Sequence, residues 1–349
     1  YYHFMNIVTP VLELVGSLGL LLYGMKLMSD GVQKSAGEKL QRTLSVVTSN
    51  KFVAILTGML ITMIIQSSGA TTVMVVTFVN AGLISLAQSA GVIFGANIGT
   101  TITAWIVSIF GFNFKISAFA VPVVGLGYFL SIFKKRKYQN IGEAVMGFGL
   151  LFLGLSGLSS VFTPDQLGWM LNIKGSGLSA IILGFLIGIV VTALLHSSSA
   201  FSAIVITMAY NGLISWELAA AMTLGSNVGS TVDSIMASMG TSANGRRAAL
   251  IHVMFNLFGT IVVLCFLKPF LELVMFITPG QENSNIAIRI SMLHTVFNII
   301  TTVVMTPLSG KLVKIAEFLI KDDPSEKKKV FKLEFVEHSG KENARLLDK

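Results

Sequence analysis

Residues 52–84 read FVAILTGMLITMIIQSSGATTVMVVTFVNAGLI, an apolar run that is interrupted once, by Gln66-Ser67-Ser68-Gly69. Residues 178–214 read LSAIILGFLIGIVVTALLHSSSAFSAIVITMAYNGLI and repeat the pattern around His196-Ser197-Ser198-Ser199. Each apolar arm has about 15 residues, or about 22 Å of helix, which falls short of a hydrocarbon core of roughly 30 Å. We therefore predict two re-entrant helical hairpins whose polar tips lie within protein at mid-membrane.

The rest of the chain has the composition of a polytopic membrane protein. Of the 349 residues, 53% are hydrophobic and 12% are charged, whereas soluble domains carry about 25% charged residues. Residues 29–50 have the spacing of an interfacial amphipathic helix. The single cysteine, Cys265, excludes an internal disulfide framework and a cysteine-based metal cluster, so no transition-metal site is expected. Seven further apolar stretches are long enough to span a bilayer, at 9–28, 86–110, 114–133, 141–160, 215–239, 248–276 and 286–307.

The two hairpins belong to a longer internal repeat with a register of 130 residues (196 − 66). The same register aligns Gly95–Thr101 with Gly225–Thr231 without a gap. One repeat contains an odd number of crossings whether or not its hairpin spans, so the second copy starts from the opposite side. Inverted repeats with interrupted helices are typical of secondary transporters. We predict an all-α polytopic membrane protein with two inverted repeats, each with a re-entrant hairpin and an interrupted transmembrane helix.

The repeat register predicts the domain order, and loop charge predicts the orientation. The first repeat covers 9–138 with its hairpin at 51–85, and the second covers 139–278 with its hairpin at 178–214. An additional transmembrane helix follows over 279–309, and a charged tail over 310–349. Basic clusters such as Lys134–Lys137 and the tail fall on one side, which the positive-inside rule places in the cytoplasm. This predicts a multi-pass protein of the cell membrane with its N-terminus outside and its C-terminus cytoplasmic.

Four polar interruptions carry the candidate chemistry: Gln66–Gly69, Gly95–Thr101, His196–Ser199 and Gly225–Thr231. The exposed N–H groups of a broken helix hold anions. Carbonyl, hydroxyl and amide oxygens suit a hard cation such as Na⁺. These motifs contain no Arg or Lys, so bound Na⁺ would supply the charge that a multivalent anion needs. Packing through small residues would explain a single such motif, but two inverted copies at matching depth favour a binding site.

The candidate site residues divide into two sets. We expect the anion to contact Ser67, Ser68, Asn97, Ser197, Ser198 and Asn227. We expect Na⁺ to be held by Gln66, Thr100, Thr101, His196, Ser199, Ser230, Thr231 and Asp233. Asp233 has a second interpretation, a salt bridge with Arg246 or Arg247, and the sequence leaves the two open. Its repeat partner is Thr103, so the two halves of the site differ here.

The paired motifs, with His252 and Phe255-Asn256, resemble the type II sodium–phosphate cotransporters. That family carries a doubled Gln-Ser-Ser-Ser motif and a doubled Gly-Ala/Ser-Asn-Ile-Gly-Thr-Thr motif, and the resemblance covers residues 16–307. It implies Na⁺-coupled phosphate uptake with substrate between the hairpin tips. It also implies that the hairpin-bearing elements move as a unit against a scaffold. Gly69 departs from the third Ser of the first copy, and His196 from the Gln of the second. The implied partners are phosphate, Na⁺ and the lipid bilayer, without nucleic acid, and a homodimer is left open.

Three other functions compete with this interpretation. Another small oxyanion, sulfate or a carboxylate, would fit the same architecture. An intramembrane serine hydrolase would need His196 to activate Ser197, but adjacent residues make a poor relay and a duplicated motif would serve no purpose. A passive channel would not need paired anion and cation sites, so sodium dependence separates it from a transporter. We therefore expect a secondary transporter rather than an enzyme.

Overall fold

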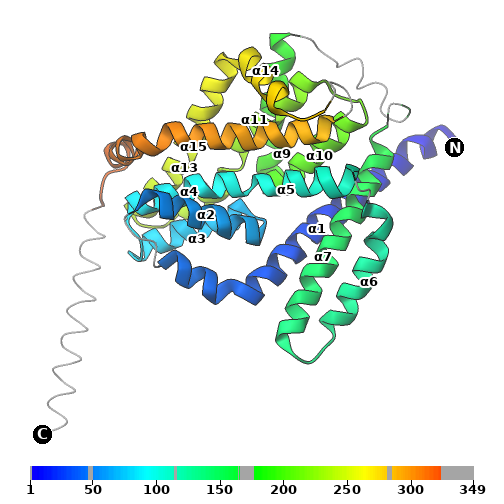
Figure 1. Cartoon of the computed structure of the whole chain (residues 1–349), viewed down its shortest axis with the longest axis horizontal. Helices are drawn as coiled ribbons and strands as arrows, with labels where there is room; N and C mark the ends of the chain where they lie inside the picture. The colour runs from blue at the N-terminus through cyan, green and yellow to red at the C-terminus, as the bar shows by residue number, and fades with distance from the viewer. Residues whose placement is uncertain are drawn as a thin grey trace, which may run out of the picture.

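The computed structural model describes residues 2–45, 50–113, 116–163, 165, 177–280 and 285–323, and every regular element in these ranges is helical (Figure 1). In chain order the elements are α1 (Tyr2–Ser45), α2 (Lys51–Ile65), α3 (Ser68–Asn80), α4 (Leu86–Gly99), α5 (Thr101–Ile106), the π-helix η1 (Val107–Asn113), the 3-10 turn η2 (Ile116–Phe119), α6 (Ala120–Ser131), α7 (Arg136–Val161), α9 (Leu178–Leu195), α10 (Ser198–Tyr210), α11 (Trp216–Gly229), α12 (Val232–Ser238), α13 (Ala243–Cys265), α14 (Leu267–Ile277) and α15 (Ile286–Leu319).

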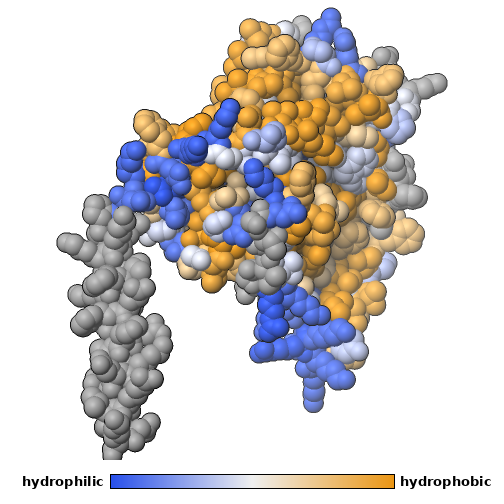
Figure 2. All heavy atoms as spheres, turned by 60° about the vertical axis from the view of Figure 1, so that its left-hand side comes forward, coloured by the Kyte–Doolittle hydropathy of each residue, from blue (hydrophilic) through white to orange (hydrophobic). Residues whose placement is uncertain are grey.

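Within the described ranges, six helical segments are long and apolar enough to cross a membrane: Val8–Leu40, Leu86–Phe112, Arg136–Val161, Leu178–Leu195, Ala243–Cys265 and Ile286–Leu319. Leu178–Leu195 is the first arm of the second predicted hairpin, and its 18 residues make it longer than the arm that was expected to fall short of a span. The surface agrees, because hydrophobic residues dominate the face drawn in Figure 2 and hydrophilic residues gather in patches. Phe52, Leu194 and Phe276 are among many large apolar side chains that are exposed. Lipid accommodates such a surface, whereas water does not. The predicted all-α membrane protein is confirmed.

The repeat register of the sequence reappears in the packing of glycines. A Cβ atom at Gly58 of α2 would collide with the carbonyl oxygen of Val92 of α4. A Cβ atom at Gly188 of α9 would collide with the carbonyl oxygen of Met222 of α11, and 92 + 130 = 222. Only glycine permits this approach of two backbones. The pair α2–α4 is therefore repeated as α9–α11 in the same register.

The first helices of the two halves also pack on each other through glycine. A Cβ atom at Gly24 of α1 would lie 2.7 Å from the carbonyl oxygen of Gly147, and one at Gly154 of α7 would lie 2.7 Å from that of Ser17. Gly24 and Gly154 are themselves 130 residues apart. Figure 1 shows α1 running alongside α7. This contact joins the beginnings of the two predicted repeats.

Two apolar clusters hold the broken-helix pairs in place. The first buries α10, through residues such as Phe201 and Ile206, against α1 and α7. The second buries α2 and α3, through residues such as Ile65 and Val76, against α4, α13 and α15. Each pair is thus anchored on helices from elsewhere in the chain, and its polar tip is held at a defined place.

The structure differs from four predicted element boundaries. Residues 29–45 continue α1 instead of forming a separate helix, since Gly31 is helical and packs against Ala144 of α7. The stretch predicted as one span at 248–276 is broken after Cys265, because Pro269 lacks an N–H and its ring clashes with the carbonyl four residues earlier. At 114–133 the helix α6 begins only at Ala120, where Pro122 fits a first turn. Finally, α15 extends past the predicted 309 to Leu319, and the tail beyond 323 lies outside the described residues.

Candidate substrate and cation site

The two broken-helix tips have the same backbone geometry. Gln66 ends α2 in the left-handed region at φ 63°, and His196 ends α9 there at φ 51°. They are the only non-glycine residues with positive φ in the described part of the chain. Such a conformation is rare for side chains other than Asn, Asp and His. The matching breaks show that both polar interruptions end one helix and start another, as the sequence predicted.

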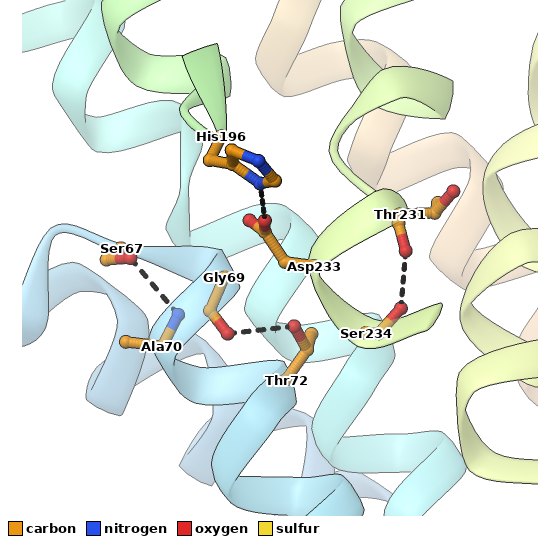
Figure 3. Close-up of polar contacts among 8 residues, drawn as sticks. All are labelled: Ser67, Gly69, Ala70, Thr72, His196, Thr231, Asp233 and Ser234. Atoms are coloured by element: carbon orange, nitrogen blue, oxygen red, sulfur yellow. Dashed lines mark hydrogen bonds and ion pairs between the residues drawn. The ribbon is translucent and has the colours of Figure 1, made fainter. Parts of the chain in front are cut away.

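A serine caps the new helix at each tip. The Ser67 hydroxyl accepts a hydrogen bond of 3.1 Å from the Ala70 N–H (Figure 3). The Ser197 hydroxyl accepts one of 3.1 Å from the Ala200 N–H. Both hydroxyls keep their own hydrogen, which remains free to be donated to an anion. The N–H groups ahead of the capped one have no intrahelical acceptor. Each tip therefore presents N–H and O–H donors together.

Both tips line one cavity of about 400 Å³. Nine of the predicted site residues border it: Gln66, Ser67, Ser68, His196, Ser197, Ser198, Ser199, Ser230 and Asp233. The opposite wall comes from α1 and carries a lysine and an aspartate one helical turn apart, Lys26 and Asp30. The predicted convergence of two distant motifs on one site is thus seen, and α1 adds charges that the motifs lack.

The other five predicted residues are buried and do not line the cavity: Asn97, Thr100, Thr101, Asn227 and Thr231. The Thr101 hydroxyl donates to the carbonyl of Ile98, and the Thr231 hydroxyl donates to that of Val228, in the same register. These bonds lie at the breaks between α4 and α5 and between α11 and α12. Among described groups, the Thr100 hydroxyl and the Asn227 amide nitrogen are buried without a hydrogen-bond partner.

Residues from both halves form two groups of three that are related by the repeat register. In the first triad, Thr103 donates to Gln66 Oε1 at 3.0 Å and accepts from the Ser199 hydroxyl at 3.2 Å. The corresponding residues, 130 positions away, are Asp233, His196 and Gly69, which we call the second triad. There, His196 Nδ1 lies 2.7 Å from Asp233 Oδ1, and Asp233 Oδ2 lies against Gly69 (Figure 3).

The partner of Asp233 answers a question that the sequence left open. Its carboxylate pairs with His196 of the second tip. Arg247, one of the two arginines considered, instead pairs with Asp322 at 2.9 Å and donates to the carbonyl of Ile320. Asp233 thus belongs to the cavity wall.

Sequence reasoning missed three residues outside the motifs, namely Thr103 of the first triad and the cavity-lining Lys26 and Asp30. Thr103 was noted only as the repeat partner of Asp233, and its place between the tips depends on the folded register. Lys26 and Asp30 had a signal that could have been read, because charged residues four positions apart next to an apolar span are functional candidates.

The helical fold, the apolar surface and the polar cavity between paired broken helices define a multi-pass membrane protein of the transporter type. The sequence model of the Na⁺/Pi-cotransporter family matches residues 20–160 and 170–308, so the chain belongs to this family. The first matched stretch contains the first broken-helix tip, and the second contains the second tip.

Individual relatives agree with this family. YqeW of Bacillus subtilis is 29% identical over 89% of this chain and 99% of its own length, and it is named as uncharacterized. YjbB of Escherichia coli K12, a protein whose name assigns it to inorganic phosphate export, is 29% identical over 90% of this chain but only 56% of its own length. The rat sodium-dependent phosphate transport protein 2B is 33% identical over 36% of this chain and 18% of its own length. Among solved structures, no significant match was found.

Proposed function

We propose that this chain is a secondary transporter that couples Na⁺ movement to transport of inorganic phosphate by alternating access. The observation that carries the proposal is the shared cavity of about 400 Å³ that both broken-helix tips line. The family and the names of the relatives support phosphate as the substrate and Na⁺ as the coupling ion.

Phosphate would bind between the tips. The first-turn N–H groups of α3 and α10 and the hydroxyls of Ser67, Ser68, Ser197 and Ser198 are donors that match an oxyanion. Asn227 lies deeper, with a buried amide nitrogen that has no partner among the described groups. A phosphate oxygen that reached it as the site closed would remove the cost of that unmade bond. Asn97 is its repeat counterpart, and we include both in the substrate set.

Lys26 offers a second source of positive charge. The sequence motifs contain no cation, but the Lys26 side chain borders the cavity from α1. Asp30 and Asp233 border the same cavity and offset this charge. Bound Na⁺ would then still be needed to balance a phosphate dianion, and this requirement would couple the two ions.

Na⁺ would be held by oxygen ligands around the helix breaks. We assign this role to Gln66 and Ser199 at the tips and to Thr100, Thr101, Ser230 and Thr231 at the two helix interruptions. The buried hydroxyl of Thr100 has no hydrogen-bond partner among the described groups, so its oxygen could serve as a ligand for the cation. His196 and Asp233 were expected in the same set, and their direct contact leads to the inference in the next subsection.

The direction of transport follows from the gradient. With Na⁺ higher outside, coupled movement gives phosphate uptake, which is the direction that the sequence resemblance implies. A reversed Na⁺ gradient would drive export through the same site. We propose the cell membrane as the location, with the N-terminus outside and the C-terminus in the cytoplasm.

Proteoliposomes with radiolabelled phosphate test the proposal. We expect accumulation against a phosphate gradient when Na⁺ is high outside, and none when K⁺ replaces Na⁺. Phosphate flux that is equally fast without Na⁺ would indicate a channel and contradict coupling. Sulfate that competes as well as unlabelled phosphate would point to another oxyanion on the same architecture.

A further inference from the structure

The first and second triads are equivalent in register but opposite in chemistry. All three side chains of the first triad, Gln66, Thr103 and Ser199, offer oxygen atoms. Hard cations bind by gathering several oxygen ligands. A cation that displaced the weak hydrogen bonds between these residues would gain three side-chain oxygens at once.

The second triad has lost two of those three oxygens. His196 replaces the amide oxygen of Gln66 with a ring nitrogen. An ionised carboxylate only accepts hydrogen bonds, so when Asp233 is ionised the hydrogen of its 2.7 Å contact with His196 lies on Nδ1. A donor therefore points into the place where the first triad points an acceptor.

Gly69 completes this change of chemistry. It stands where Ser199 stands in the first triad, and a Cβ atom there would collide with Asp233 Oδ2. A serine at position 69 would require the Asp233 carboxylate to move from the place that it holds here. Relative to the first triad, the loss of a side chain at Gly69 and the gain of a carboxylate at Asp233 are thus coupled. Figure 3 shows Asp233 lying between His196 and Gly69.

The other charged groups near the pair do not replace His196 as its partner. Lys26 and Asp30 of α1 border the same cavity and carry opposite charges. On α13, His252 hydrogen-bonds Ser234, the residue after Asp233, and Arg247 pairs with Asp322. The Asp233 side chain is 17% exposed and that of His196 is 50% exposed, so the pair lies at the cavity wall rather than in free solvent.

We propose that the second triad is closed to Na⁺ and does not bind it. The N–H of His196 takes the place that a Na⁺ ion would take beside the carboxylate. The first triad keeps its oxygens and remains a Na⁺ position. This chain would then bind one Na⁺ fewer than a transporter with two oxygen-lined triads. The inference rests on the proposed function for its meaning in transport, but the number of bound Na⁺ ions can be measured without phosphate.

The experiment counts ²²Na⁺ bound per purified chain by scintillation proximity, with no phosphate present. The symmetrised variant G69S/H196Q/D233T gives the second triad the residue types of the first, and we expect it to bind one Na⁺ more than the wild type. The mirror variant Q66H/T103D/S199G gives the first triad the chemistry of the second, and we expect one Na⁺ fewer. Size-exclusion profiles and melting curves show which variants fold.

Asp233→Asn provides a test that does not depend on the multiple variants. If the second triad is closed to Na⁺, removal of the carboxylate charge leaves the Na⁺ count unchanged. Loss of one Na⁺ in Asp233→Asn would overturn the inference, because it would show that the carboxylate is a Na⁺ ligand. An unchanged count in a folded G69S/H196Q/D233T variant would also overturn it.

Failure of the proposed function has a different signature. Wild-type protein that does not move phosphate with Na⁺ in proteoliposomes contradicts the transport proposal, whatever the Na⁺ counts are. Normal coupled transport with unaltered counts in both folded triple variants contradicts only the closed second triad.

Discussion

Replacement of Ser67 separates the structural role of its hydroxyl from its role in binding. The hydroxyl caps α3 through the Ala70 N–H and, in the proposed function, also donates to phosphate. Ser67→Ala removes both interactions. Ser67→Gly removes the hydroxyl but keeps a residue that is acceptable at a helix N-cap, where glycine costs only a few tenths of a kcal/mol relative to serine. The two variants therefore share the binding defect and differ in the stability defect.

The magnitudes follow from the two interactions. Loss of the cap in Ser67→Ala destabilises the protein by about 0.5–2 kcal/mol. Loss of one hydrogen bond to a charged ligand costs about 1.5–3 kcal/mol, which weakens phosphate affinity by roughly ten- to a hundred-fold. Phosphate affinity should thus fall by a similar factor in both variants, whereas the melting temperature should fall mainly in Ser67→Ala.

The assays are Na⁺-dependent phosphate uptake in proteoliposomes and thermal melting of the purified protein. Ser197→Ala and Ser197→Gly repeat the design at the second tip, where the same 3.1 Å cap is present. Wild-type phosphate affinity in Ser67→Gly, with a defect confined to Ser67→Ala, would refute a binding role and leave the serine as a cap only.

Three further changes test the site, the packing and the topology. Lys26→Gln removes the cavity-lining lysine and should raise the phosphate concentration for half-maximal uptake severalfold, and unchanged uptake kinetics would remove Lys26 from the site. Gly58→Ala forces a Cβ atom against a backbone carbonyl and should cost about 1–3 kcal/mol in stability, whereas Gly125→Ala in α6, with nothing within 4 Å, should leave the melting temperature unchanged or raise it. With Cys265 replaced, cysteines at Lys51 and Ser179, which lie at the starts of α2 and α9, should react with an impermeant thiol reagent from opposite sides of the membrane. Reaction from one side would contradict the inverted repeats.

The sequence predicted the places where helices break, because those places carry local signals. Polar and small residues within an apolar run, as at Gln66–Gly69, are costly in lipid unless the backbone leaves the helix to serve a site. Glycines in the same register, such as Gly58 and Gly188, lie where backbones approach closely in the structure. The break after Cys265 also has a local signal, Pro269, which the prediction of a single span at 248–276 did not use.

The partner of Asp233 could not be predicted in the same way. Arg246 and Arg247 are the nearest basic residues along the chain, and His196 is 37 positions away. The choice depends on the left-handed backbone at His196, which turns the imidazole toward α12, and on the space that Gly69 leaves open. Neither the backbone conformation at His196 nor the space at Gly69 identifies a partner until folding brings the two tips together. Sequence spacing predicts contacts within one helix, but it does not rank partners across a cavity.

The two departures from the family motif have a common physical cause in the folded chain. Taken alone, Gly69 loses a hydroxyl and His196 loses an amide oxygen, and each change weakens a polar site. In the structure they flank the same carboxylate, which needs both the empty space at Gly69 and the N–H of His196. A carboxylate at Asp233 beside a serine at 69 and a glutamine at 196 would be crowded on one side and less well paired on the other. The three residues therefore act as one unit, and Gly69→Ser or His196→Gln alone is expected to be more damaging than the combined exchange of all three.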